Sequence, residues 1–152
     1  MRLLATMAVC GLIAAVPASA QDLPVEAPEG KRWMSCFVRL KDPNGSQGSI
    51  AVGGYWLVTV PDGARSATET ELKAKWLEEY VPRVPKEFPG KTAVQRYNGD
   101  WDANCTSYRS RQEWPNFVRH VKEPLSSKSV LRSDYVPSFS TGHVSTREHA
   151  AG

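Results

Sequence analysis

The polar stretch at residues 98–105, with the sequence NGDWDANC, holds the residue types best suited to chemistry. Asp100 and Asp102 lie two residues apart, and a pair of carboxylates is what a glycosidase uses as its acid and base. Side chains at that spacing in one turn do not oppose each other across a sugar, and no further carboxylates flank them. A small hydrolase that uses Asp100 and Asp102 is therefore retained as an alternative function.

The same stretch has the first part of a calcium-loop pattern. Asp100, Asp102 and Asn104 stand at the first three ligand positions of such a loop. The pattern then fails, because Cys105 stands where the loop needs glycine and Arg111 stands where it needs glutamate. We therefore expect a turn that leads into a helix, and no metal site.

Other catalytic patterns are missing from the sequence, which has no Gly-x-Ser-x-Gly, no phosphate-binding glycine loop and no His-Glu-x-x-His. His143 and His149 fall in an expected tail, and His120 falls on the surface of an expected helix, so a nucleophile finds no base beside it. We therefore favour a function without catalysis and expect no cofactor.

Residues 1–20 have the three parts of a secretory signal peptide. Arg2 gives a charged start, an apolar run follows from Leu3 to Val16, and small residues at 18–20 form a cleavage site. We expect cleavage after Ala20, export to the periplasm or beyond, and no transmembrane helix in the mature chain. An uncleaved anchor or a lipid on Cys10 are the alternatives, but the run is short for a bilayer and continues past Cys10.

Removal of the signal peptide leaves two cysteines, Cys36 and Cys105. An even pair in an oxidising compartment predicts a disulfide. A reactive thiol and a metal pair are the competing hypotheses, and neither has a Cys-x-x-Cys or a suitably spaced histidine to support it.

A β-hairpin is predicted at residues 33–60. Alternation along 33–40 places Cys36 on the core face of the first strand and Trp33 and Phe37 on the other. Turn-forming residues fill 41–48, and the second strand follows at 49–60, with one parity occupied by Ile50, Val52, Trp56, Val58 and Val60. The glycines at 53 and 54 indicate a β-bulge in that strand, with a ligand contact as the alternative.

An amphipathic helix is predicted next, because Thr68 and Glu71 form a capping-box pattern ahead of a periodic apolar run. Its inner face would comprise Leu72, Trp76, Leu77 and Tyr80. Pro82 and Pro85 would end it, and a short strand is expected at 92–97.

A second helix and a last strand complete the prediction. Ser110 and Glu113 repeat the capping pattern before an apolar stripe of Trp114, Phe117, Val118 and Val121. A strand is expected at 129–136.

The order β-β-α-β-α-β predicts an α+β domain at residues 31–136, in which two helices pack on one face of a mixed sheet. Cys36 would meet Cys105 at the start of the second helix. Residues 21–30 are expected to be an extended lead-in, and residues 137–152 a disordered tail.

The strand with Cys36, the helix with Trp76 and Tyr80, and Asn104-Cys105-Thr106 before a second helix together resemble small exported bacterial α+β domains of unassigned function. The resemblance covers residues 33–136 and implies a disulfide and a compact α+β fold, and it assigns no functional residue. The predicted architecture is also similar to the peptidoglycan-binding domains of the cell-division type, with a different strand order.

A candidate binding surface combines basic and aromatic side chains. The whole chain has 19 Lys+Arg and 16 Asp+Glu, so its net charge indicates no partner. The segment 109–132 is locally basic, and helices on one face of the sheet would leave aromatic side chains exposed on the other. The predicted surface comprises Arg109, Arg111, Arg119, Lys122, Trp33, Phe37 and Tyr55.

The partner of this surface in an exported protein would be a membrane surface, an anionic cell-wall polymer or an acidic envelope protein, and not nucleic acid. An ordinary solvated helix face and an oligomer interface are the alternatives for its basic and aromatic parts. We therefore predict a non-catalytic exported domain that acts by binding. A protein inhibitor of an envelope hydrolase is a further alternative.

Overall fold

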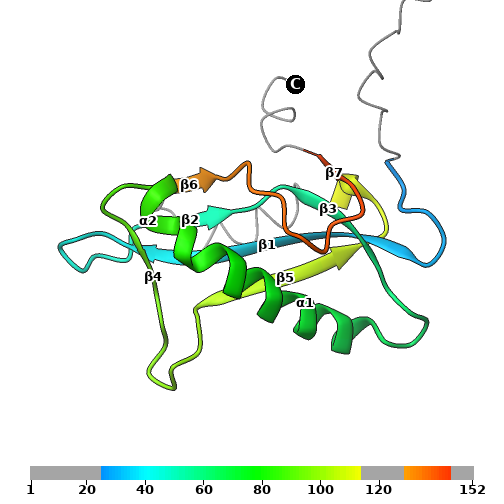
Figure 1. The fold of residues 1–152 in the computed structure, drawn as a ribbon, viewed down its shortest axis with the longest axis horizontal. Coiled ribbons are helices and arrows are strands. Elements are labelled where there is room, and N and C mark those ends of the chain that lie inside the picture. Colours follow the sequence, from blue (N-terminus) through cyan, green and yellow to red (C-terminus); the bar gives the residue numbers. More distant parts are fainter. Residues whose placement is uncertain (1–24, 114–128, 145–152) are drawn as a thin grey trace, which may run out of the picture.

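The computed structural model describes residues 25–113 and 129–144, which form a mixed α+β fold with one main helix and one disulfide (Figure 1). The strands are β1 (Lys31–Lys41), β2 (Ser49–Val52), β3 (Tyr55–Thr59), β4 (Thr92–Ala93), β5 (Ala103–Tyr108), β6 (Ser129–Arg132) and β7 (His143–Val144). The helical segments are α1 (Arg65–Tyr80), η1 (Val81–Arg83), α2 (Val84–Glu87) and η2 (Arg111–Glu113). The α+β prediction is confirmed.

Strand β1 is the centre of the sheet, and it forms where the sequence alternates most clearly. It pairs antiparallel with β2 and β3 along one edge and with β4 and β5 along the other. Met34, Cys36, Val38 and Leu40 contribute to one apolar cluster, while Trp33 belongs to a second cluster on the opposite face. The predicted hairpin and the inward direction of Cys36 are therefore confirmed.

The predicted bulge is also confirmed, and it changes which side chains face the helix. Phe37 pairs with Val52 and Met34 pairs with Trp56, so the two residues of β1 between them oppose three residues of the partner chain. Residues after the bulge consequently change face, since side chains alternate with a period of two. Ile50 and Val52 lie in the cluster of Trp33, whereas Trp56 and Val58 lie under α1.

The prediction that one face of the second strand carries Ile50, Val52, Trp56, Val58 and Val60 is therefore wrong. Gly53 is required at the bulge, because a Cβ there would lie 2.3 Å from the ring atom Cη2 of Trp56.

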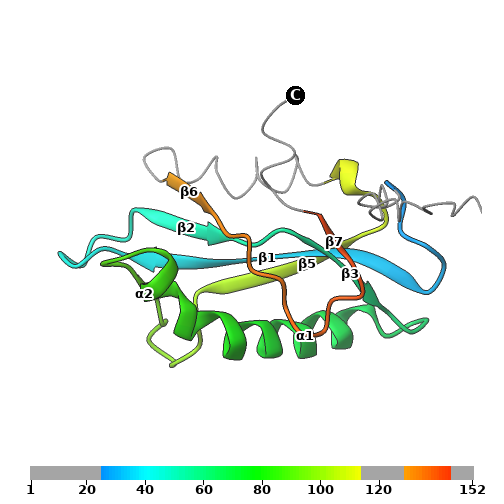
Figure 2. The same cartoon turned by 45° about the horizontal axis from the view of Figure 1, so that its top comes forward.

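Helix α1 covers the face of the sheet that carries Cys36 (Figure 2). Its buried residues are the predicted Leu72, Trp76, Leu77 and Tyr80. The predicted capping box is wrong, because the helix begins earlier, at Arg65, and its N-cap Ala64 makes no side-chain hydrogen bond. The regular helix ends at Tyr80, before the predicted stop at Pro82.

The largest correction concerns residues 103–108, which were expected to lead into a helix and instead form β5. Ala103, Cys105 and Ser107 are buried, and small or polar residues of this kind give little strand signal in a sequence. The strand forms because six of its residues pair with the strongly predicted β1. Strand β4 is shorter than the predicted segment 92–97.

Part of the second capping pattern is present. The backbone N–H of Ser110 donates to the Glu113 carboxylate (3.1 Å), and Ser110 Oγ accepts from the N–H of Gln112 (3.3 Å). The stripe predicted from Trp114 to Val121, and with it the second helix, lies outside the described residues.

Residues near both ends of the described chain take part in strand pairing, although the sequence predicted an extended lead-in and a disordered tail there. Residues 25–27 pair with 109–111, as in the bond from Ala27 N to Arg109 O (2.7 Å). Strand β6 ends at Arg132, short of the predicted end at 136, and runs parallel to β2. The prediction of disorder from Pro137 is wrong for residues 137–144, because β7 pairs with β3 and Val144 is 6% exposed. None of the helices in the described segments is both long and apolar enough to cross a membrane.

Candidate functional site

The two carboxylates predicted for a hydrolase have structural partners. Asp102 accepts hydrogen bonds from Arg39 Nε (2.6 Å) and Arg96 Nη2 (3.0 Å). Burial alone would raise the pKa of Asp102, but the bonds and charges of Arg96 and Arg39 outweigh it and hold that pKa below its usual value. A lowered pKa makes the Asp102 carboxyl less suited to donate a proton as a general acid.

Asp100 belongs to a turn. Its backbone N–H donates to Asn98 Oδ1 (3.1 Å), and its carboxylate accepts from Asn98 Nδ2 (2.7 Å). No group of three or more His, Cys, Asp or Glu side chains is placed to hold a metal within 25–113 and 129–144.

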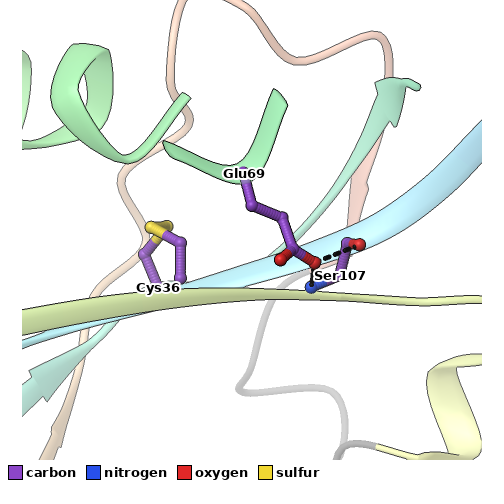
Figure 3. Close-up of a disulfide and its surroundings, with 4 residues drawn as sticks. Cys36, Glu69 and Ser107 are labelled. Carbon is purple, nitrogen blue, oxygen red and sulfur yellow. Dashed lines mark hydrogen bonds between the residues drawn. A yellow bond between two sulfur atoms is a disulfide. The ribbon is translucent and has the colours of Figure 1, made fainter. Parts of the chain in front are cut away.

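The cysteines form the predicted disulfide, although between two strands and not between a strand and a helix. Cys36 and Cys105 lie directly opposite each other on β1 and β5, with their Cα atoms 4.1 Å apart. Both are buried beneath α1, at 0% and 6% exposure (Figure 3). The bridge is therefore a buried structural link and not an accessible reactive thiol.

A serine and a carboxylate meet beside the disulfide, in the arrangement of a nucleophile and its base (Figure 3). Glu69 Oε1 accepts from the hydroxyl of Ser107 (2.5 Å) and from its backbone N–H (2.9 Å), and Arg65 Nη2 donates to the Ser107 carbonyl (2.7 Å). Burial alone would raise the pKa of Glu69, but the hydrogen bonds from Ser107 and Arg65 have the larger effect and hold that pKa below its usual value. Because Ser107 is only 1% exposed, no substrate reaches it, and the cluster serves to tie α1 to the edge of β5.

The aromatic part of the predicted binding surface is not exposed. Trp33 and Tyr55 are both 0% exposed and contact each other edge to face, with ring centroids 6.5 Å apart. Arg111 lies over the Trp33 ring, 5.2 Å from its centroid, and Phe37 is half-buried. The expectation of an open aromatic sheet face is therefore wrong for Trp33 and Tyr55.

The error arose from treating one sheet face as core and the other as surface. The bulge sends Ile50 and Val52 to the face of Trp33, where they complete a second apolar cluster with Leu57, Tyr108 and Val144. Arg119 and Lys122 lie outside the described residues.

Arg109 remains exposed, and it lines a cavity of about 470 Å³ at the end of the sheet where β1 and α1 begin. Two turns shape its walls. Lys31 N donates to the carbonyl of Pro28 (3.0 Å), and Ala64 N donates to the carbonyl of Pro61 (3.1 Å). Gly30 and Gly63 have positive φ angles of 69° and 72°, which a residue with a side chain rarely adopts.

Charged side chains of both signs line this cavity. The basic ones are Lys31, Arg32, Arg65 and Arg109, and the acidic ones are Glu26, Glu29 and Asp62. They come from the first residues of β1, the start of α1, the turn before it and the segments that pair at 25–27 and 109–111. We call this set the basic cavity.

Sequence reasoning found only Arg109 among the basic members, because Lys31-Arg32, Arg65 and Arg109 lie in three parts of the chain that are far apart in the sequence. The available signal was a basic residue within two positions of each turn glycine, in Gly30-Lys31-Arg32 and Gly63-Ala64-Arg65.

Comparisons of this chain with family models, with curated proteins and with solved structures gave no match. Function must therefore be inferred from the residues of the site.

Proposed function

We propose that this protein is a non-catalytic exported domain that binds an anionic polymer of the cell envelope through the basic cavity. The observation that carries the proposal is that four Lys or Arg residues from three separate segments of the chain line one cavity. Guanidinium groups suit such a ligand, because their planar donors match the oxygens of carboxylates and phosphates in pairs.

Export is supported by the disulfide, because buried disulfides persist in oxidising compartments. The signal-peptide pattern at residues 1–20 belongs to the same proposal.

The acidic members of the cavity have a role in this function. Glu26, Glu29 and Asp62 reduce the net charge of the cavity to +1, counting four basic and three acidic side chains. A ligand must therefore place its anionic groups near the arginines and away from these carboxylates, which favours a polymer with spaced charges.

The test is binding of the purified mature protein to isolated cell-wall sacculi, compared between Arg109→Glu and the matched variant Lys86→Glu. Lys86 is exposed on α2 and does not line the cavity. Each variant replaces one positive charge by one negative charge, so both change the net charge of the protein equally. We expect Arg109→Glu to weaken binding about tenfold and to reduce its salt dependence, while Lys86→Glu binds like the wild type.

Equal binding by the two variants would remove the basic cavity from consideration. The wild type could instead bind an acidic envelope protein and not sacculi, with that binding dependent on Arg109. The ligand would then be a protein and not the polymer.

A further inference from the structure

We propose that the start of α1, at residues 65–71, forms a latch over the outer edge of β5, and that an open latch lets two copies of this chain pair through that edge. The side chains that close the latch are Arg65 and Glu69. Glu69 does not line the basic cavity, so a change at Glu69 tests the latch independently of the proposed function.

The backbone of β5 directs its polar groups alternately toward β1 and away from it. Arg39 N donates to Asp102 O (2.8 Å), so the residue just before β5 directs its backbone groups at β1. Hydrogen-bonded positions alternate along an antiparallel strand. Thr106 therefore bonds with β1, whereas Cys105 and Ser107 direct their N–H and C=O groups to the outer edge.

Both outward backbone groups of Ser107 are bonded to side chains of α1. Its N–H donates to Glu69 Oε1 (2.9 Å), as Figure 3 shows, and its carbonyl accepts from Arg65 Nη2 (2.7 Å). Arg65 Nε also donates to Glu69 Oε1 (3.1 Å), which links the two side chains across one helical turn. A neighbouring strand would offer Ser107 one acceptor and one donor in the same way, so this pair of side chains occupies the place of a strand.

The next part of the same edge is covered by backbone. Arg109 has the same parity as Ser107, and its carbonyl accepts from Ala27 N (2.7 Å), within the pairing of residues 25–27 with 109–111. Ser107 differs from Arg109 because side chains and not a backbone segment cover it. A single substitution can therefore uncover Ser107 without moving a strand.

The start of α1 has few other attachments to the sheet. The buried residues of this helix begin at Leu72, and none of residues 65–71 is buried. The N-cap Ala64 makes no side-chain hydrogen bond. Loss of the bonds to Ser107 should therefore let residues 65–71 open locally, while Trp76 keeps the second half of the helix in place.

An uncovered β5 edge suits a second copy of this chain. Natural proteins protect edge strands with lysine, proline or a bulge, and the sequence ANCTSY of β5 has no charged residue and no proline. Two such strands can pair antiparallel about a twofold axis without bringing like charges of the strands together. The contact uses the same edge of both copies, so the product is a closed dimer and not a fibre.

The first experiment measures self-association of the purified mature protein by sedimentation equilibrium, and it compares Glu69→Ala with the matched variant Glu71→Ala. Glu71 lies on the same helix, where its carboxylate accepts from Lys75 Nζ (2.6 Å), and both variants remove one negative charge. We expect Glu69→Ala to form dimers about tenfold or more tightly than the wild type, and Glu71→Ala to match the wild type. Glu69→Gln should also stay close to the wild type, because its amide oxygen can still accept from Ser107 N.

The second measurement uses hydrogen exchange and begins with the wild type at low protein concentration. The Ser107 amide depends on Glu69, whereas the neighbouring Thr106 amide depends on β1. Local opening of residues 65–71 should therefore give Ser107 a protection factor about tenfold or more below that of Thr106. In the Glu69→Ala protein, the Ser107 amide should become more protected as the concentration rises and the dimer forms.

The proposal is overturned if Glu69→Ala remains as monomeric as the wild type, or if Glu71→Ala associates equally well. Equal protection factors of Ser107 and Thr106 in the wild type would mean that the start of α1 does not open separately. That result would overturn the latch even where Glu69→Ala failed to fold. A dimer in which Ser107 gains no protection would be joined through another surface, and it would contradict the proposal as well.

Discussion

Two segments leave the edges of the sheet, and they end in opposite environments. The hairpin at residues 94–102 stands away from the body and carries a fully exposed Tyr97. The segment at 133–142 between β6 and β7, which we call the strap, runs toward α1 and carries the half-buried Tyr135 (Figure 2). The ring of Tyr135 stacks on Tyr80, with centroids 5.5 Å apart, and lies beneath the guanidinium of Arg83 at 4.7 Å.

The two segments are also held differently. Backbone hydrogen bonds to Arg39 of β1 fix the hairpin at its base. The disulfide between Cys36 and Cys105 joins β1 to β5 nearby. The strap also has backbone bonds to the sheet at its ends, from Ser133 N to Val52 O (3.0 Å) and from Thr141 N to Leu57 O (2.9 Å). Between them it is held by a side chain of α1, since Glu79 accepts hydrogen bonds from the Tyr135 hydroxyl and from the backbone N–H and hydroxyl of Ser138. One tyrosine therefore stabilises the fold, and the other is presented to solvent on a rigid support.

The largest expected effect comes from removing the disulfide, which joins β1 to β5, the strand that follows the hairpin. Cys36→Ala with Cys105→Ala should lower the free energy of unfolding by about 4 kcal/mol, because the bridge closes a loop of 69 residues in the unfolded chain. Urea denaturation measures this loss. Hydrogen exchange should then show a greater loss of protection at Val94 and Asp102, at the base of the hairpin, than at Thr141 in the strap. Equal losses at both places would contradict the difference in anchoring.

The next effect compares the two tyrosines directly. Tyr135→Ala should lower the free energy of unfolding by about 2 to 3 kcal/mol, since it removes a half-buried ring from the stack with Tyr80 and one of the hydrogen-bond donors to Glu79. Tyr97→Ala should change it by no more than about 0.5 kcal/mol. The two variants delete the same side chain, so each is the control for the other. Similar losses would mean that Tyr97, despite its exposure, has a structural role.

The parts of this fold that sequence reasoning predicted are those with a strong local pattern. Strand β1 alternates without interruption, and the buried stripe of α1 recurs at helical spacing. The disulfide followed from the number of cysteines and the compartment. Each of these depends on residues that are neighbours in the sequence or on a simple count.

The parts that it missed depend on contacts between distant segments. Strand β5 contains Asn104, Cys105 and Thr106 and gains its conformation by pairing with β1, about 70 residues earlier. The strap has few large apolar residues, yet Phe139 packs edge to face on Trp56. The basic cavity requires three chain segments to meet, which no local pattern records.

The smallest expected effect tests how the strap is held, through the dependence of stability on pH. Burial would raise the pKa of Glu79, but its bonds from Ser138 and Tyr135 lower it below the ordinary value of 4.5. A carboxyl whose pKa is lower in the folded state contributes stability above the unfolded-state pKa and loses that contribution as the pH falls through the folded-state value. Because Glu79 is partly solvated, its contribution should be no more than about 1 kcal/mol.

The measurement is urea denaturation of the wild type and Glu79→Gln from about pH 7 to about pH 3. Glu69, Asp102 and Asp42 also have lowered pKa values, so acid weakens both proteins, and only the difference between them reports on Glu79. That difference should be present at neutral pH and shrink below about pH 4.5 as the wild-type carboxyl becomes protonated. A difference that stays constant with pH would mean that the strap is held by the stack of Tyr135 on Tyr80 and not by the charge of Glu79. The strap would then owe its position to uncharged contacts, whereas the base of the hairpin keeps the ion pair from Arg39 to Asp102.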